Sequence, residues 1–235
     1  RQINNLFNDF ADARIYRRRG PATDADEKKF GLDDNAFRVI TRDAGGQILN
    51  SVLIGKAAAD NLYHFARIEG EKGVFLITGN FSFPKTAVSW LQQPLLSLSP
   101  ADIRSLKIGQ ETAVRPDIIV PFRIKGKQAV PDISRYLNAL GFVAAYDVRR
   151  SADFDRLQFS APKSLTVTTF DGLVVTIEVY GRTGEEYWAS FKFSTTTLPT
   201  TAVNDYIKSS AFLYEDWYFR LAPDVGRILF NAFIQ

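Results

Sequence analysis

A run of alternating, β-branched residues at positions 165–193 constrains the fold of this chain more than any other stretch. Two apolar segments flank Asp171-Gly172, and an Asp-Gly pair between alternating segments is a strong signal for a hairpin turn. A third, aromatic segment, Tyr187–Phe193, follows at once. Because side chains alternate between the two faces of a strand, this stretch predicts an antiparallel β-meander with one apolar face.

Composition limits the class of protein. The 235 residues leave room for one large or two modest domains, and 46% apolar with 23% charged residues is typical of a folded chain. Cysteine is absent, which excludes disulfides, thiolate metal sites and a cysteine nucleophile. The net charge of +3 is close to balance and is not accompanied by a basic stripe, so it does not indicate nucleic-acid binding. No apolar run is as long as a membrane span, and no signal peptide is visible.

Periodicity and turn residues predict the other elements. Helical spacing or cap signals indicate helices over 3–13, 86–96, 133–140, 201–212 and 223–233. Alternating segments indicate hairpins over 37–54, 63–78 and 101–127. The polar residues 22–29 are predicted to be a loop.

The two halves show these elements in the same order. Each half has a helix followed by consecutive arginines, a hairpin, an aromatic strand and a helix that opens with Thr-Ala-Val. We therefore expect an α+β fold of two tandem repeats, each an antiparallel β-meander packed with amphipathic helices. The first repeat is expected to span residues 1–100, and the second 101–235 with a connecting hairpin at 101–127.

Candidate chemistry is sparse. The single histidine, His64, lies on a predicted strand and is better interpreted as a half-exposed strand residue than as a general base. One histidine without cysteine offers no ligand set for zinc, although a hard cation held by oxygen ligands is left open. The acidic residues between Asp24 and Asp34 lack the ligand alternation of a calcium loop. We therefore predict no catalytic, metal or cofactor residues.

Consecutive arginines form the candidate interaction surface. Arg17, Arg18 and Arg19 could contact phosphates or anionic headgroups, and Arg149 and Arg150 occupy the corresponding place in the second half. The alternative is a solvated edge strand whose charges discourage edge-to-edge pairing. The aromatic run 217–219 could form a stacking platform, but in a strand it is better interpreted as core.

Several segments resemble a known family. These are Phe30-Gly31-Leu32-Asp33 before a strand, Leu53-Ile54-Gly55-Lys56, Tyr63-His64-Phe65-Ala66-Arg67, Thr169-Phe170-Asp171-Gly172-Leu173 and Trp217-Tyr218-Phe219. Together they resemble the bacterial family of domains of unknown function numbered 4340. The resemblance implies tandem copies, an anchor of one N-terminal membrane helix preceding Arg1, and a soluble part outside the cytoplasm. It also implies auxiliary proteins that accompany ABC-type transporters and gliding-motility-like partners.

The leading hypothesis is thus a non-enzymatic extracytoplasmic (periplasmic) accessory or interaction domain of a membrane transport system. Its expected partners are membrane transporter or motility-type proteins, with no nucleic acid. One alternative is an extracytoplasmic binding module for a glycan or lipid, which the aromatic content favours. A third is an enzyme that uses carboxylates alone, which requires two facing Asp or Glu residues in a cleft.

Overall fold

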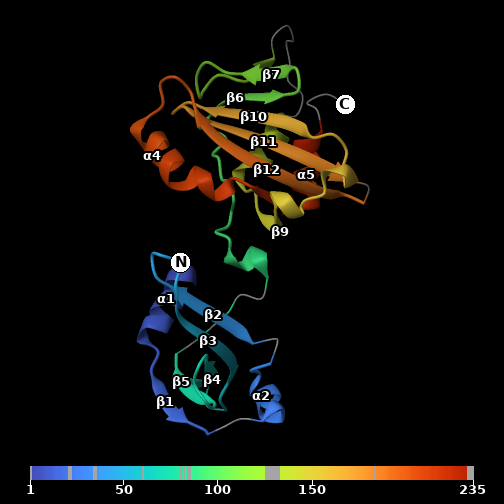
Figure 1. Cartoon of the computed structure of the whole chain (residues 1–235). Coiled ribbons are helices and arrows are strands. Elements are labelled where there is room, and N and C mark those ends of the chain that lie inside the picture. The colour runs from blue at the N-terminus through green and yellow to red at the C-terminus, as the bar shows by residue number, and fades with distance from the viewer. Residues whose placement is uncertain are drawn as a thin grey trace. The chain divides into compact units, whose positions relative to one another are not determined.

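The chain is organised as two compact units, Arg1–Lys85 and Thr86–Gln235. The computed structural model describes residues 2–20, 23–33, 36–59, 61–79, 81, 83, 86–124, 133–182 and 184–231. Both units are mixed α+β, with mostly antiparallel sheet and few helices (Figure 1). Residues 86–100, which the sequence analysis placed in the first repeat, belong to the second unit, where Leu95, Leu96 and Leu98 are buried in the core.

The first unit is a five-stranded antiparallel sheet with two helices. Its strand order is β1-β5-β4-β3-β2. The elements are α1 (Gln2–Asp12), β1 (Ile15–Arg18), α2 (Asp24–Phe30), β2 (Phe37–Arg42), β3 (Ile48–Ala57), β4 (Tyr63–Ile68) and β5 (Phe75–Thr78). Both hairpins predicted for this half are confirmed, because β2 pairs with β3 and β4 pairs with β5.

Each face of this sheet is covered by a different helix. On one face, Leu6 and Phe10 of α1 pack against a core of buried strand residues. On the other face, the Phe30 ring at the end of α2 stacks on Phe65 of β4, with 4.2 Å between ring centres. The loop predicted at 22–29 is therefore wrong. Thr23 and Asp26 form a reciprocal capping box, and these local hydrogen bonds begin a helix that charged residues alone did not indicate.

The second unit is built on an eight-stranded antiparallel sheet of order β8-β7-β6-β10-β11-β12-β13-β9. Its strands are β6 (Ile103–Ile108), β7 (Glu111–Val114), β8 (Arg123–Ile124), β9 (Ala145–Arg150), β10 (Lys163–Thr169), β11 (Leu173–Arg182), β12 (Glu186–Thr195) and β13 (Trp217–Leu221). Its α-helices are α3 (Ile133–Gly141), α4 (Thr201–Ser210) and α5 (Pro223–Phe230). Short 3₁₀ turns are η1 (Ala87–Trp90), η2 (Ser151–Asp153), η3 (Arg156–Gln158) and η4 (Ala211–Tyr214).

The predicted meander forms the centre of this sheet. β10, β11 and β12 pair in sequence, and the turn between β10 and β11 consists of Phe170, Asp171 and Gly172. Gly172 has a φ of +96°, which only glycine adopts without strain. The segment 101–127 was predicted to be a connecting hairpin with short β-like runs at 118–120 and 122–124. The hairpin that it contains is instead formed by β6 and β7, while residues 118–120 form a turn and Arg123–Ile124 form β8. Residues 125–127 lie outside the described part of the chain.

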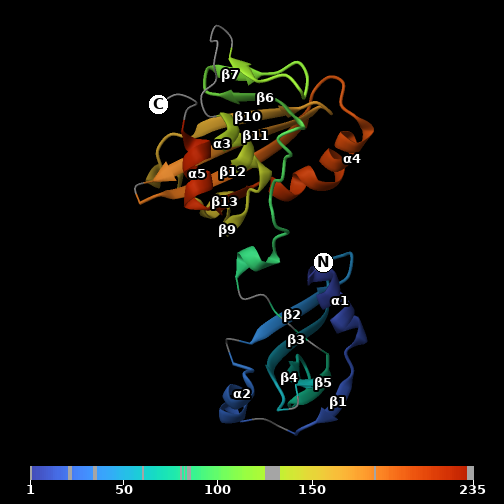
Figure 2. The same cartoon turned by 180° about the vertical axis from the view of Figure 1, so that it is seen from behind.

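The two faces of the eight-stranded sheet carry different clusters. α3 and α5 lie against one face (Figure 2), over the large apolar core that includes Val167, Ile177 and Phe191. On the opposite face, Trp188, Tyr180 and Tyr218 form a smaller aromatic cluster with Phe154 and Phe159. Those two phenylalanines come from the connection between β9 and β10, which covers this face as α2 covers its face in the first unit.

Five strands of the second sheet follow the same order as the five of the first. The order β9-β13-β12-β11-β10 matches β1-β5-β4-β3-β2, and in each case a helix precedes the first strand. The register also corresponds. Ile54 of β3 lies opposite Phe37 and Ala66, and Ile177 of β11 lies opposite Leu165 and Phe191. β6, β7 and β8 extend only the second sheet, beyond β10.

Candidate functional site

The arginines singled out in the sequence lie on or beside outer strands. Arg17 and Arg18 belong to β1, which ends the first sheet, and Arg19 follows it; Arg149 and Arg150 belong to β9, which ends the second. All five are exposed. The first three thus belong to one unit and the last two to the other.

Equivalent arginines on these two outer strands contact aromatic rings in the same way. Arg18 pairs with Phe75, and its guanidinium carbon lies 6.0 Å from the centre of that ring. Arg150 pairs with Trp217 at the corresponding position, with a distance of 5.3 Å. Such cation–π contacts hold the stem of an arginine against the sheet while its charge faces solvent. These outer strands therefore present fixed positive charge.

A second charged group lies beside the aromatic cluster of the second unit. The Trp188 indole N–H donates to Glu186 at 2.8 Å, and Arg182 Nη2 forms an ion pair with the same carboxylate at 2.6 Å. The hydrogen bond from Trp188 lowers the pKa of Glu186, and the charges of Arg182, Arg220 and Arg149 lower it further. Burial opposes these effects.

The sequence reasoning missed this group, although a signal was present. Glu186 and Trp188 are two residues apart in a strand, so they share a face, and strand pairing sets Arg182 opposite Glu186. Of the arginines around Glu186, only Arg149 was among the interaction residues predicted from the sequence. Arg149 lies over the Trp188 ring, 4.7 Å from its centre, so the arrangement fixes an arginine-rich patch at this end of the sheet.

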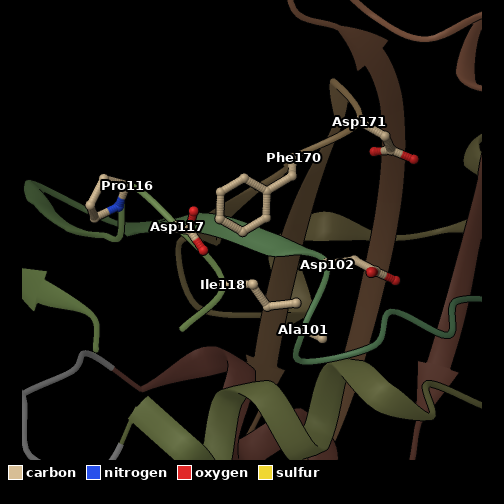
Figure 3. A pocket seen from close by; sticks show the side chains of 7 residues that line it. All are labelled: Ala101, Asp102, Pro116, Asp117, Ile118, Phe170 and Asp171. Carbon is tan, nitrogen blue, oxygen red and sulfur yellow. The ribbon is translucent and has the colours of Figure 1, made fainter. Parts of the chain in front are cut away.

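A pocket of about 450 Å³ lies elsewhere on the second unit. Its walls come from the turn before β6, the segment after β7 and the turn between β10 and β11. Figure 3 shows the residues that line it: Ala101, Asp102, Pro116, Asp117, Ile118, Phe170 and Asp171. In this view the Phe170 ring lies between Asp117 on one side and Asp102 and Asp171 on the other.

Arg115, which is 8% exposed, holds these walls together. Its guanidinium donates to the backbone oxygens of Ile103, Ile118, Pro100 and Ala101. It also lies over the rings of Phe122 and Phe170. The walls are therefore joined by a buried cation that bonds to carbonyl groups. Nothing in the sequence pattern indicated this residue, because backbone carbonyls carry no sequence signal.

The carboxylates of the pocket serve its own turns. Asp171 accepts hydrogen bonds from the Thr169 hydroxyl and the Leu173 N–H, and Asp117 accepts one from the Ile119 N–H at 3.3 Å. The pocket presents carboxylates beside one exposed aromatic ring, an arrangement that can bind a cationic or hydroxyl-bearing group. Within the described ranges, no cluster of three or more histidine, cysteine, aspartate or glutamate residues could hold a metal ion.

The other residues considered in the sequence have structural roles. The Nδ1 atom of His64 lies 3.3 Å from the Gly55 oxygen, and the ring packs edge-on against Phe81. Trp188 is fully buried, while Trp90 and Trp217 are partly buried. In the run 217–219, Tyr218 faces the aromatic cluster and Phe219 faces the main core, so the interpretation of this run as core is confirmed for those two residues.

Comparison with known proteins identifies a family. None of the helices in the described part of the chain is long and apolar enough to span a bilayer. No curated protein and no solved structure matches the chain. The model of a family described as a domain of unknown function (DUF4340) matches residues 1–130, which cover the first unit and the strands β6 to β8 of the second. Because this match spans more than half of the sequence, the chain belongs to the DUF4340 family.

Proposed function

We propose that this protein is a non-enzymatic extracytoplasmic accessory protein of an ABC-type or gliding-motility-like membrane transport system. Membership of the family supports the proposal, together with the partners that the family resemblance implies. In this proposal one N-terminal membrane helix preceding Arg1 anchors the protein, and both units lie outside the cytoplasm. Its partners are then subunits of the transporter.

We further propose that the two units are tandem copies of one α+β module with amphipathic helices. The support is the shared strand order, the matching register around Ile54 and Ile177, and the shared arginine–aromatic contacts of β1 and β9. In each unit a helix packs on the core face, through Phe10 in α1 and Leu140 in α3. The model of the family matches residues 1–130, which include the first unit and strands β6 to β8 of the second, and it ends before α3.

The observation that carries the interaction role is the fixed positive charge on equivalent outer strands. Arg18 and Arg150 are held by aromatic rings at matching positions. Held side chains lose less conformational entropy when a partner binds, which favours recognition of an acidic protein surface. In the pocket, two of the three aspartates are engaged in their own turns, which favours a structural over a catalytic role.

Site-specific cross-linking in native membranes tests this proposal. A photo-reactive residue in place of Arg150 in the full-length protein is expected to cross-link to a subunit of an ABC-type transporter. Replacement of the exposed Lys208 in α4 provides a matched control of the same charge, which should give no such product. Products that contain lipid alone, or equal products at both positions, would contradict the proposal.

The location is tested separately. In intact cells whose outer barrier has been opened, an extracytoplasmic protein is digested by added protease while a cytoplasmic marker survives. Protection of the protein in this assay would contradict the extracytoplasmic placement. Its association with membranes should also persist through a high-salt wash, because an anchoring helix is held by apolar burial and not by charge.

The alternative, a binding module for a glycan or lipid, stays a prediction. A sugar platform requires two or more exposed aromatic rings in a concave site, and Phe170, which is 39% exposed, is the one aromatic residue that lines the described pocket. Retention of the protein on immobilised glycans, reduced by Phe170→Ala, would favour this alternative over the transport role.

A further inference from the structure

Strand β2 has a strand neighbour on one side only in the described part of the first unit, because it ends the sheet. Its outward-facing backbone groups can be assigned from the next strand. The Glu69 N–H donates to the Ser51 oxygen, so Ser51 of β3 faces β4 and does not bond to β2. Ile40 lies opposite Ser51, and its N–H and C=O therefore point away from β3, toward the free edge. The backbone N–H and C=O of Arg38, two residues earlier in the strand, point toward the same free edge.

The corresponding edge of the second unit is occupied. There β6 pairs with β10 in antiparallel orientation, and Leu106 lies opposite Val167. Leu106 is fully buried in the core, so the added strand contributes both hydrogen bonds and apolar burial. By strand order and register, Val167 corresponds to Val39 of β2, which packs at the margin of the first core. In the described part of the first unit, no strand pairs with the edge that β6 covers in the second unit.

The side chains of β2 define what kind of strand fits. Phe37 and Val39 face the core side, whereas Arg38 and Ile40 face the other side, and Ile40 is 42% exposed. The charged residues of β2 are Arg38 and Arg42, both exposed. An added strand would therefore set apolar residues beside Val39 and acidic residues beside the arginines, in alternation.

We propose that the free edge of β2 binds an extended acidic segment of a partner protein as an antiparallel sixth strand. Backbone hydrogen bonds supply the affinity, and alternating acidic and apolar side chains supply the selectivity. A second copy of this chain fits less well, because pairing about Ile40 would set Arg38 opposite Arg42 of the other copy. The inference goes beyond the transport role and does not depend on it.

The test uses the whole chain and a capped peptide of alternating glutamate and valine, matched in length to β2. Amide hydrogen exchange is measured residue by residue, with and without the peptide. Binding at this edge should slow the exchange of the Arg38 and Ile40 amides while leaving the Arg17 amide of β1 unchanged. A peptide of alternating lysine and valine has the same backbone and should bind at least about tenfold more weakly at low salt.

Two variants separate the backbone contribution from that of charge. Ile40→Pro removes an N–H that points to the free edge, and it should lower the affinity for the glutamate peptide at least about tenfold. If Ile40→Pro does not fold, Arg38→Glu still tests the site. It should weaken the glutamate peptide about threefold to tenfold and strengthen the lysine peptide. Lys208→Glu makes the same charge change on the exposed helix α4 of the second unit and should leave both affinities unchanged.

Three outcomes would overturn the proposal. The first is no binding of the glutamate peptide up to about 1 mM. The second is slower exchange at β1 in place of β2. The third is a dimer in sedimentation velocity that Ile40→Pro abolishes, which would make a second copy the occupant. Failure of the transporter cross-link would leave peptide binding at β2 intact, so the two proposals fail separately.

Discussion

The guanidinium of Arg115 lies over the ring of Phe122, with 4.6 Å between its central carbon and the ring centre. The Phe170 ring is also within reach of the same cation, at 5.5 Å. Four backbone carbonyl groups complete its surroundings. The charge of this buried arginine is therefore stabilised by carbonyl dipoles and aromatic faces.

Arg115→Gln should destabilise the second unit by about 3 kcal/mol, because a buried charge is removed and one buried and three partly buried carbonyl groups lose their donor. Arg115→Lys retains the charge but lacks the planar set of donors, so it should also destabilise the protein, by a smaller amount. Urea unfolding measures both free energies. Arg104→Gln, an exposed change on β6, is the control and should stay within about 0.5 kcal/mol of the wild type. If Arg115→Gln lowers the free energy of unfolding by no more than the control does, the role given to Arg115 is contradicted.

Gly226 permits close contact between α5 and β12. A Cβ atom at this position would lie 2.3 Å from the Cβ of Tyr187. Gly226→Ala should therefore displace α5 and destabilise the protein by about 1 to 3 kcal/mol, despite the higher helix propensity of alanine. Gly141→Ala in α3 meets no atom closer than 3.9 Å and should be neutral or stabilising. Thermal unfolding compares the two; equal melting temperatures would show that α5 can shift without loss.

The lowered pKa of Glu186 predicts a specific response to acid. The hydrogen bond from Trp188 and the charge of Arg182 favour the ionised carboxylate in the folded state. The ionised Glu186 therefore stabilises the fold at pH values above its ordinary pKa of 4.5, and this stabilisation is lost as the pH falls through the lower pKa of the folded state. The free energy of unfolding should thus fall less steeply in Glu186→Gln than in the wild type below that pH. Glu185→Gln serves as the control, and a slope for Glu186→Gln equal to the wild-type slope would contradict the prediction.

The raised pKa of Tyr214 predicts how the stability of the protein changes at alkaline pH. Burial raises its pKa from 10.0 to about 12, and its hydroxyl donates to the Leu95 oxygen at 2.7 Å. A raised pKa stabilises the fold below the unfolded value, and this contribution is lost as pH rises toward the folded value. Tyr214→Phe should be less stable by about 1 kcal/mol at neutral pH, because the hydrogen bond is lost. Its stability should then fall less between pH 10 and 12 in denaturant titrations; parallel curves would be the contrary result.

The antiparallel hairpins could be predicted from the sequence because their signals are local. At Asp171-Gly172 the turn residues and the alternating strands that they join lie next to one another in the chain, and the observed pairing of β10 with β11 confirms them. The order of the distant strands was not accessible in this way. β9 pairs with β13 and β6 pairs with β10 across long separations, which propensity does not encode.

The helix predicted at 86–96 is wrong for a physical reason. The spacing of Val88, Leu91 and Leu95 resembles a helical stripe, but Pro94 lacks the N–H that a helix interior requires. The Gln93 side chain instead bonds to the backbone of Ala145 in β9, and only the 3₁₀ turn Ala87–Trp90 forms. Tertiary hydrogen bonds have overridden the local pattern.

The candidate sites also differ in whether the sequence reveals them. Arginines at the ends of strands are visible as sequence runs, so Arg18 and Arg150 could be singled out before their aromatic partners were known. The pocket could not be predicted, because its organiser, Arg115, bonds to carbonyl groups of segments that meet only in the folded unit. Residues whose partners are backbone atoms leave no pattern for sequence reasoning to detect.

The pairing of β6 with β10 also sets an order of events during synthesis. The strands of the first unit are complete once Thr78 has been made, and domains generally fold as units in the order of their translation. β6, with Ile108, gains its neighbour in the sheet only once Leu165 is available to pair with it. Until then the hairpin of β6 and β7 is a nascent segment with an open apolar side. A chaperone that protects this protein as it folds should therefore bind the β6–β7 hairpin until β10 pairs with it.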